Sequence, residues 1–130
     1  VGYGQVDYRL RKDPRVVVME RVNARYPLNF PEKMDAATMD LSFISIEKVI
    51  PSVAENLKDN GCLLVLVKPQ FESKRGEVGR GGVIKDPQVH AKVLGRFIKW
   101  AVEHNYRFKG LVASPITGAS GNREFFVLLT

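Results

Sequence analysis

The chain has 130 residues, the length of one domain, and is long enough to bury a core without disulfides. A content of 45% hydrophobic and 26% charged residues excludes a disordered polypeptide, and the single cysteine, Cys62, excludes a disulfide framework and fits a reducing compartment. The longest apolar run, Cys62–Val67, is far shorter than the roughly 18 residues of a membrane span. We therefore expect no membrane span, and the net charge of +6 favours a polyanionic partner such as nucleic acid.

The first half of the chain predicts two strands and a helix. The β-branched run Arg15–Met19 and the segment Ala36–Met39 are typical of buried strands. Apolar residues then recur at the spacing of one helix face: Ile46, Val49, Ile50, Val53 and Leu57. This pattern predicts a helix that begins after Ser45, bends at Pro51 and ends at Asn60-Gly61.

The second half predicts a buried strand, a loop, a helix and a hairpin. The continuous apolar run Cys62–Val67 is typical of a strand buried on both faces in a parallel sheet. The polar, glycine-rich segment Ser73–Gly82 predicts a mobile loop, and Asp86-Pro87 predicts a helix start. Tyr106–Ala113 and Arg123–Leu129, joined by a short turn, predict an antiparallel hairpin. The alternation of strands and helices indicates an α/β fold with a largely parallel sheet.

Charged residues stand at three ends of the predicted strands. Asp40 follows the second strand, Lys68 follows the third, and Glu124 begins the last. Ligands of α/β sheets bind beyond the carboxyl ends of strands. A lysine directly after an apolar strand is costly to bury without a partner, and Asp40 is the natural one. From residue types alone, the pair is either a simple ion pair that closes the sheet or a desolvated, tunable lysine at a cleft.

Six motifs occur in an order that resembles one protein family. They are Gly2–Gln5, Asp40–Ser45, Val67–Glu72, Gly76–Gly79 with Gly82-Val83, Ser114–Gly118 and Asn122–Phe125. Together, across essentially all of residues 1–130, they are similar to the catalytic domain of the TlyA family. These haemolysin-A-like proteins carry an FtsJ-type RNA methyltransferase domain. The resemblance implies a Rossmann-like class I methyltransferase sheet, mostly parallel with a C-terminal antiparallel hairpin. It also implies 2′-O-methylation of ribosomal RNA with S-adenosylmethionine as the methyl donor.

The resemblance also implies the site residues. The family has a catalytic Lys-Asp-Lys-Glu tetrad, in which Asp40 matches the Asp, Lys68 the second Lys and Glu124 the Glu. Cofactor contacts are implied at Val1, Gly2, Asn23, Ala24 and Asp40. The first Lys of the tetrad, the first strand and helix, the cofactor loop and an RNA-binding domain are expected upstream of Val1. We accordingly expect the 130 residues alone to be inactive.

The chemistry fits these residue types. A ribose 2′-hydroxyl is a weak nucleophile that must approach the methyl group in line, so positioning and electrostatics supply most of the catalysis. Lys68 would stabilise the developing alkoxide or accept the proton as a base, Asp40 would orient Lys68, and Glu124 would complete the pairing. We expect an RNA-contacting flap, poorly ordered without RNA, whose phosphate contacts are Lys74, Arg75, Arg80 and Lys85.

Two other functional classes remain open. Asp40–Phe43 lies where amino-group methyltransferases carry Asn/Asp-Pro-Pro-aromatic, but the prolines are missing, and Lys68 and Glu124 disfavour that class. A non-enzymatic RNA-binding or haemolysin-type membrane-active protein is the other alternative. We expect no metal site, because His90 and His104 lie too far apart on one predicted helix to share an ion. The expected partner is ribosomal RNA or a ribosomal subunit, and the expected location is the cytoplasm.

Overall fold

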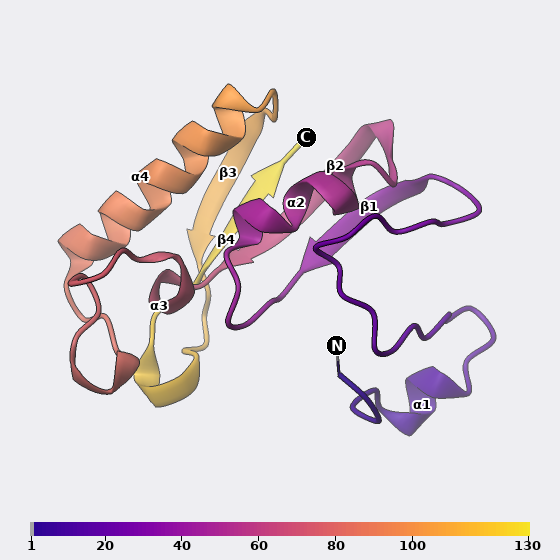
Figure 1. Ribbon diagram of the computed structural model, residues 1–130, viewed down its shortest axis with the longest axis horizontal. Helices are drawn as coiled ribbons and strands as arrows, with labels where there is room; N and C mark the ends of the chain where they lie inside the picture. Colours follow the sequence, from indigo (N-terminus) through magenta and orange to yellow (C-terminus); the bar gives the residue numbers. More distant parts are fainter. Residues whose placement is uncertain (1) are drawn as a thin grey trace.

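A computed structural model describes residues 2–130 and contains one four-stranded sheet (Figure 1). The strands are β1 (Met34–Met39), β2 (Leu57–Val67), β3 (Phe108–Ala113) and β4 (Phe125–Leu129). The helices are α1 (Tyr8–Arg11), α2 (Ile50–Ala54), α3 (Pro69–Glu72) and α4 (Pro87–Glu103), with 3₁₀ turns η1 (Ile46–Lys48), η2 (Arg80–Gly82) and η3 (Ala119–Gly121). None of the helices within residues 2–130 has the length and apolar character needed to cross a membrane.

The strand order β1-β2-β4-β3 combines parallel and antiparallel pairs. β1 runs parallel to β2, whereas β4 is antiparallel to both β2 and β3. The predicted α/β class and C-terminal hairpin are confirmed. Within residues 2–130, parallel pairing is confined to β1 and β2, because the last strand inserts between β2 and β3 instead of extending the parallel edge.

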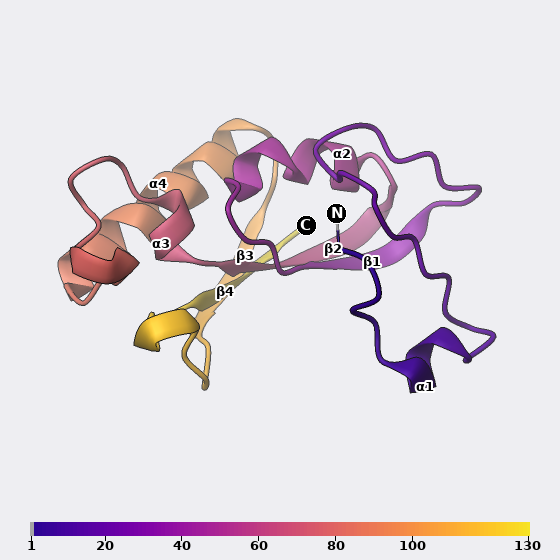
Figure 2. The same cartoon turned by 60° about the horizontal axis from the view of Figure 1, so that its bottom comes forward.

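The hydrophobic core lies between the sheet and two helices on the same side of it, α2 and α4 (Figure 2). α4 begins as predicted, with Pro87 in its first turn and the Asp86 side chain accepting a hydrogen bond from the backbone N–H of Gln88 at 2.9 Å. The core side chains from the sheet alternate along their strands, as the pleat requires. The core comprises Met39, Ile46, Val49, Ile50, Leu63, Val65, Val67, Val93, Leu94, Phe97, Ala101, Val127 and Leu129.

The opposite face of the sheet is apolar but less covered than the sequence predicts. Cys62, Leu64 and Leu128 alternate with the core residues and are only half-buried. Both α2 and α4 lie on the other side of the sheet (Figure 2). The sequence predicts that β2 is buried on both faces. Within residues 2–130, however, helices cover only one face of the sheet.

The predicted strand at Arg15–Met19 is wrong. This segment forms no strand, and Val17 is 84% exposed. β-Branched residues favour strands only where a neighbouring strand supplies a pairing partner, and this segment lies outside the sheet. The short helix α1 precedes it, away from the sheet (Figure 1), with Asp7 accepting from the backbone N–H of Arg9 at 2.8 Å.

The predicted helix from Ser45 to Asn60 is also wrong in its extent. Pro51 has no N–H to continue the helical hydrogen bonds, so η1 ends and α2 restarts with Pro51 in its first turn. The backbone then enters β2 at Leu57. Asn60-Gly61 lies at an irregularity of the β1–β2 pairing instead of ending a helix. A Cβ at Gly61 would come within 2.9 Å of the Lys58 carbonyl oxygen, which explains the glycine there.

Candidate active site

An ion pair joins the carboxyl ends of the two parallel strands. The Nζ of Lys68, directly after β2, lies 2.7 Å from Oδ1 of Asp40, directly after β1, and donates to Oγ of Ser42 at 3.2 Å. The Lys68 side chain is 13% exposed, whereas that of Asp40 is 70% exposed. The cation is therefore largely shielded from water, while its partner carboxylate remains open to a ligand.

Glu124 lies beside this pair but does not form an ion pair with Lys68 within the described chain. The β2–β4 register pairs Val67 with Phe125, so its extension by one residue places Lys68 opposite Glu124. Glu124 is buried, with 8% exposure, and its Oε2 accepts a hydrogen bond from Nε2 of Gln70 at 2.9 Å. The structure thus brings Asp40 and Lys68 into contact and places Glu124 opposite Lys68 on the neighbouring strand, where its hydrogen-bond partner is an amide that the sequence did not point to.

Glu72, at the end of α3, fixes the loop that carries Asp40. Its carboxylate accepts hydrogen bonds from Oγ of Ser45 at 2.7 Å and from the backbone N–H of Ile46 at 2.8 Å. Burial raises the pKa of Glu72 above its ordinary value, an effect that these two hydrogen bonds oppose. The sequence signal for Glu72 was its place in the Val67–Glu72 motif, which indicated a family but not a contact.

An aromatic contact joins the same loop to α3. The rings of Phe43 and Phe71 are 4.8 Å apart between centroids, with an interplanar angle of 52°. Phe43 is 90% exposed and has a φ of 61°, an unusual backbone conformation for a bulky residue. Loop Asp40–Ser45 is therefore tied to α3 through both a carboxylate and a ring contact.

A hollow of about 800 Å³ opens beside Asp40. Its lining includes all members of the predicted cofactor set that the structure describes: Gly2, Asn23, Ala24 and Asp40. Val1, the remaining member, lies outside the described residues. The Ser52 hydroxyl of α2 donates to the Ala24 carbonyl oxygen and fixes this wall of the hollow. Segments far apart in the sequence therefore form one concave surface next to the ion pair.

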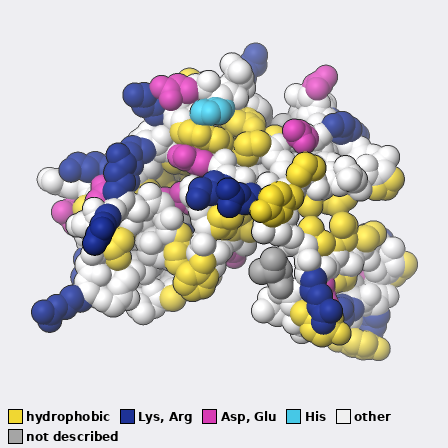
Figure 3. All heavy atoms as spheres, in the orientation of Figure 1, with side chains coloured by type: hydrophobic (Ala, Val, Ile, Leu, Met, Phe, Trp, Pro, Cys, Tyr) yellow, Lys and Arg dark blue, Asp and Glu magenta, His cyan; other side chains and the backbone are white. Residues whose placement is uncertain are grey.

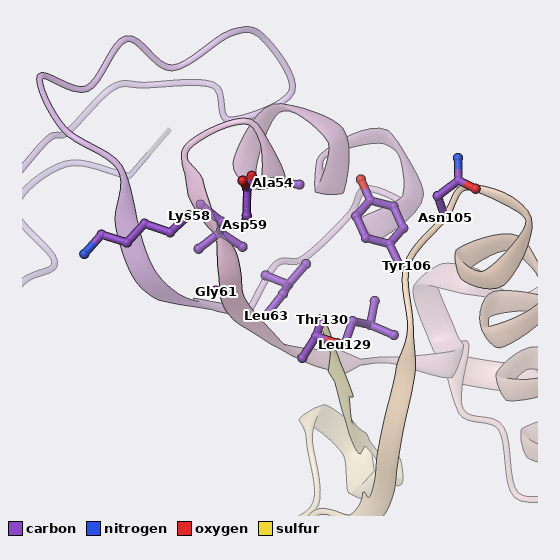
Figure 4. Close-up of a pocket in the computed structure, with 10 residues that line it drawn as sticks. Ala54, Lys58, Asp59, Gly61, Leu63, Asn105, Tyr106, Leu129 and Thr130 are labelled. Carbon is purple, nitrogen blue, oxygen red and sulfur yellow. The ribbon is translucent and has the colours of Figure 1, made fainter.

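A smaller hollow of about 230 Å³ lies at the opposite end of the sheet (Figure 4). Leu63, Leu129 and the ring of Tyr106 contribute to its wall, and burial raises the pKa of the Tyr106 hydroxyl. This hollow contains none of the predicted catalytic, cofactor or RNA-contacting residues. We therefore place the candidate active site at the Lys68 end.

The basic segment between α3 and α4 exposes the four predicted RNA contacts, Lys74, Arg75, Arg80 and Lys85. Lys and Arg side chains gather along this segment and α4 (left in Figure 3). Side-chain hydrogen bonds hold this segment against the rest of the domain. Arg96 of α4 donates two hydrogen bonds to Glu77, at 2.7 and 2.9 Å, and the buried Asn122 accepts from the Ile84 N–H at 3.0 Å.

The stabilisation that the Glu77–Arg96 ion pair gives the fold depends on pH, and this dependence can be measured. The Arg96 hydrogen bonds, aided by the Lys74 N–H, lower the pKa of Glu77 from 4.5 to about 2. A lowered pKa in the folded state means that the stabilisation is complete above pH 4.5 and is lost as the pH falls toward 2. Glu77→Gln should therefore melt below the wild type at neutral pH, and the two melting temperatures should converge as the pH falls from 4.5 to 2.

Circular dichroism melting curves over this pH range test the contribution of the Glu77–Arg96 ion pair to stability. Glu103→Gln is the control, because the exposed Glu103 lies 3.9 Å from its partner Lys99. A Glu77→Gln difference that stays constant between neutral pH and pH 2 would contradict the role of the Glu77–Arg96 pair.

Comparison with known proteins identifies the family. The model of the FtsJ-like methyltransferases matches residues 1–130. The 16S/23S rRNA (cytidine-2'-O)-methyltransferase TlyA of Mycobacterium tuberculosis (strain ATCC 25618 / H37Rv) is 44% identical over 131 residues, which cover 99% of this chain and 49% of that protein. Hemolysin A of Brachyspira hyodysenteriae is 37% identical over 129 residues, covering 96% of this chain and 53% of that protein.

A solved structure agrees with these relatives. The crystal structure of a Lactococcus lactis protein suggested to be a hemolysin matches with a TM-score of 0.92 at 40% identity, covering 98% of this chain and 62% of that one. The chain spans about half the length of the curated relatives it matches. On the match over its whole length, the chain belongs to the FtsJ-like methyltransferase family.

Proposed function

We propose that this protein transfers a methyl group from S-adenosylmethionine to a ribose 2′-hydroxyl of ribosomal RNA. The observation that carries the proposal is the shielded Lys68 ammonium, paired with Asp40 beside a hollow of about 800 Å³. The family match and the rRNA methyltransferase among the relatives support the same reaction.

The hollow suits a positively charged, drug-sized methyl donor. Its volume is typical of small-molecule sites, and the exposed Asp40 carboxylate gives it a negative charge next to the apolar Leu41 and Ile44. We assign donor binding to Gly2, Asn23, Ala24 and Asp40, with Val1 as a further proposed contact. S-adenosylmethionine, when bound, supplies an electrophilic methyl group on sulfur.

Lys68 acts on the attacking oxygen in this proposal. Its ammonium, held by Asp40 and Ser42, donates a hydrogen bond to the 2′-oxygen and stabilises the negative charge that develops there. The 2′-hydroxyl proton is released to solvent as the oxygen takes the methyl group, and S-adenosylhomocysteine is the leaving group. The interaction is stronger than in water because the Lys68 side chain is largely desolvated. Asp40 orients the ammonium, and Glu124 supplies a fixed negative charge on the other side of Lys68.

Replacement of Lys68 tests the mechanism. In the full-length protein, Lys68→Ala should reduce the methylation rate by at least about a thousandfold, because the charge on the nucleophile loses its stabilising group. S-adenosylmethionine binding, measured by calorimetry, should persist, since Lys68 does not line the hollow.

The chain offers a matched control for this variant. Lys58 lies in β2, the strand that Lys68 follows, and forms an ion pair with Asp35 of β1, also at 2.7 Å, but both side chains are exposed. Lys58→Ala should leave the rate close to that of the wild type. Equal rates for Lys68→Ala and the wild type would remove Lys68 from the mechanism.

We propose that the exposed basic segment binds the phosphates that flank the target ribose. Arg80→Ala with Lys85→Ala should weaken binding to ribosomal RNA and lower the slope of log affinity against log salt by about one per lost phosphate contact. The matched control replaces Arg107 and Lys109, exposed cations of the β3 region, with alanine. Equal salt slopes for the two double variants would exclude a specific role of the basic segment.

We further propose that donor binding needs more than these 130 residues. The half-buried apolar face of the sheet and the relatives' roughly twofold greater length support this view. Calorimetry with S-adenosylmethionine should give at least about tenfold weaker binding for the 130-residue chain than for the full-length protein, equivalent to about 1.4 kcal/mol. Equal micromolar affinities would overturn the proposal.

We propose a cytoplasmic location, which suits a ribosomal RNA substrate.

The two alternative functions have less support. The membrane-active alternative rests on the hemolysin names of some relatives and on no contact or site described above. In an amino-group methyltransferase, the arrangement of Lys68 and Glu124 would have no role in the reaction, because the attacking atom is a nitrogen that develops no negative charge.

A further inference from the structure

We propose that Gln70 is a positioning residue for the reaction: its amide holds the Glu124 carboxylate opposite Lys68. The absence of a side chain at Gly118 leaves the room that the carboxylate occupies there. This inference rests on the proposed function. It goes beyond it by assigning roles to two uncharged residues that act through Glu124.

The first argument is the environment of Glu124. A carboxylate with 8% exposure requires a donor, and in the described part of the chain its side-chain hydrogen bond comes from Gln70 Nε2, at 2.9 Å. Gln70 lies in α3, two residues after Lys68, and the buried Pro69 between them fixes the backbone. A single short segment therefore positions both the proposed catalytic cation and the donor to the carboxylate opposite it.

The second argument is the direction of the Gln70 amide. Its Oε1 is buried and has no hydrogen-bond partner within residues 2–130. Rotation of the amide by half a turn would place this oxygen against the Glu124 carboxylate, and two acceptors repel each other. The amide direction is therefore set by Glu124, at the cost of a buried acceptor without a donor.

The third argument is the glycine at position 118. Its φ of −80° is open to any residue, so the backbone does not require glycine. A Cβ there would collide with the Glu124 carboxylate. The turn cannot easily move away, because the N–H of Gly118 donates to the Asn122 carbonyl at 2.7 Å and the N–H of Ser114 donates to the Glu124 carbonyl at 2.8 Å. The carboxylate is thus enclosed between Gly118 and Gln70.

The consequence for catalysis follows from geometry. Displacement of a positioned group by about 1 Å can cost about a hundredfold in rate. Gln70→Met keeps the length of the side chain but removes the donor, so the Glu124 carboxylate loses its fixed position. Gln70→Glu keeps the shape and places a second carboxylate against the first.

The experiment compares these variants with Gln88→Met and Gln88→Glu in the full-length protein. Gln88 is exposed in the first turn of α4, so the control pair repeats both chemical changes away from the site. We expect Gln70→Met to lower kcat by roughly 10- to 100-fold. The KM for S-adenosylmethionine should change little, and Gln70→Glu should lower kcat at least as far. The Gln88 variants should match the wild type.

A double variant separates positioning from stability. Gln70→Glu with Glu124→Gln restores an amide–carboxylate hydrogen bond with the two groups exchanged, so the melting temperature should recover relative to Gln70→Glu. The kcat should stay low, because the carboxylate no longer lies opposite Lys68. Recovery of kcat together with the melting temperature would overturn the positioning role and leave a structural one.

The outcomes distinguish this inference from the proposed function. An inactive Lys68→Ala together with a fully active Gln70→Met would overturn the role of Gln70 alone. Wild-type methylation by Lys68→Ala, or no methylation by the full-length protein, would overturn both proposals.

Discussion

The burial of one ammonium group at the end of an apolar strand is the constraint on which the candidate site depends. The side chains of Val65 and Val67 are fully buried, so the chain reaches Lys68 in a region poor in water. A lysine is tolerable there only if a carboxylate lies at the same edge of the sheet. Parallel pairing of β1 with β2 brings the carboxyl ends of both strands to one edge and places Asp40 within 2.7 Å of Lys68. The crossover through α2 makes that pairing possible, and the helix packs on the core face.

The segment from Lys68 to Glu72 converts this ion pair into a site. Lys68 contacts the loop after β1, Gln70 contacts Glu124 before β4, and Glu72 contacts the start of η1. Proline as the second residue limits the backbone freedom of the segment, so these contacts are made with little conformational entropy left to lose. Two separate parts of the chain, the loop from Asp40 to Ile46 and Glu124, are therefore positioned by five consecutive residues.

Sequence patterns predicted what depends on local chemistry. The Asp86-Pro87 start of α4 followed from capping residues, and the terminal hairpin followed from two apolar segments joined by a short turn. The pairing of Asp40 with Lys68 followed from the rule that strand ends gather at one edge. The run Arg15–Met19 misled because strand propensity does not say whether a neighbouring strand exists. The Gln70–Glu124 bond was out of reach, because its partners are 54 residues apart and an amide facing a carboxylate leaves no periodic signal.

The ion pair at the other end of the same strands shows why pairing alone does not make a site. Lys58 and Asp35 also join β2 to β1 at 2.7 Å, yet their side chains are 50% and 86% exposed. Water screens such a pair, and its ammonium offers a ligand little that solvent does not. Lys68 differs in burial, in the larger hollow that its partner Asp40 lines and in the buried Glu124 opposite it. Because the residue types, the distance and the strands are the same in both pairs, the chemical difference comes from their surroundings. The loop after β1, α3 and the Gly118 turn supply those surroundings at the Lys68 end.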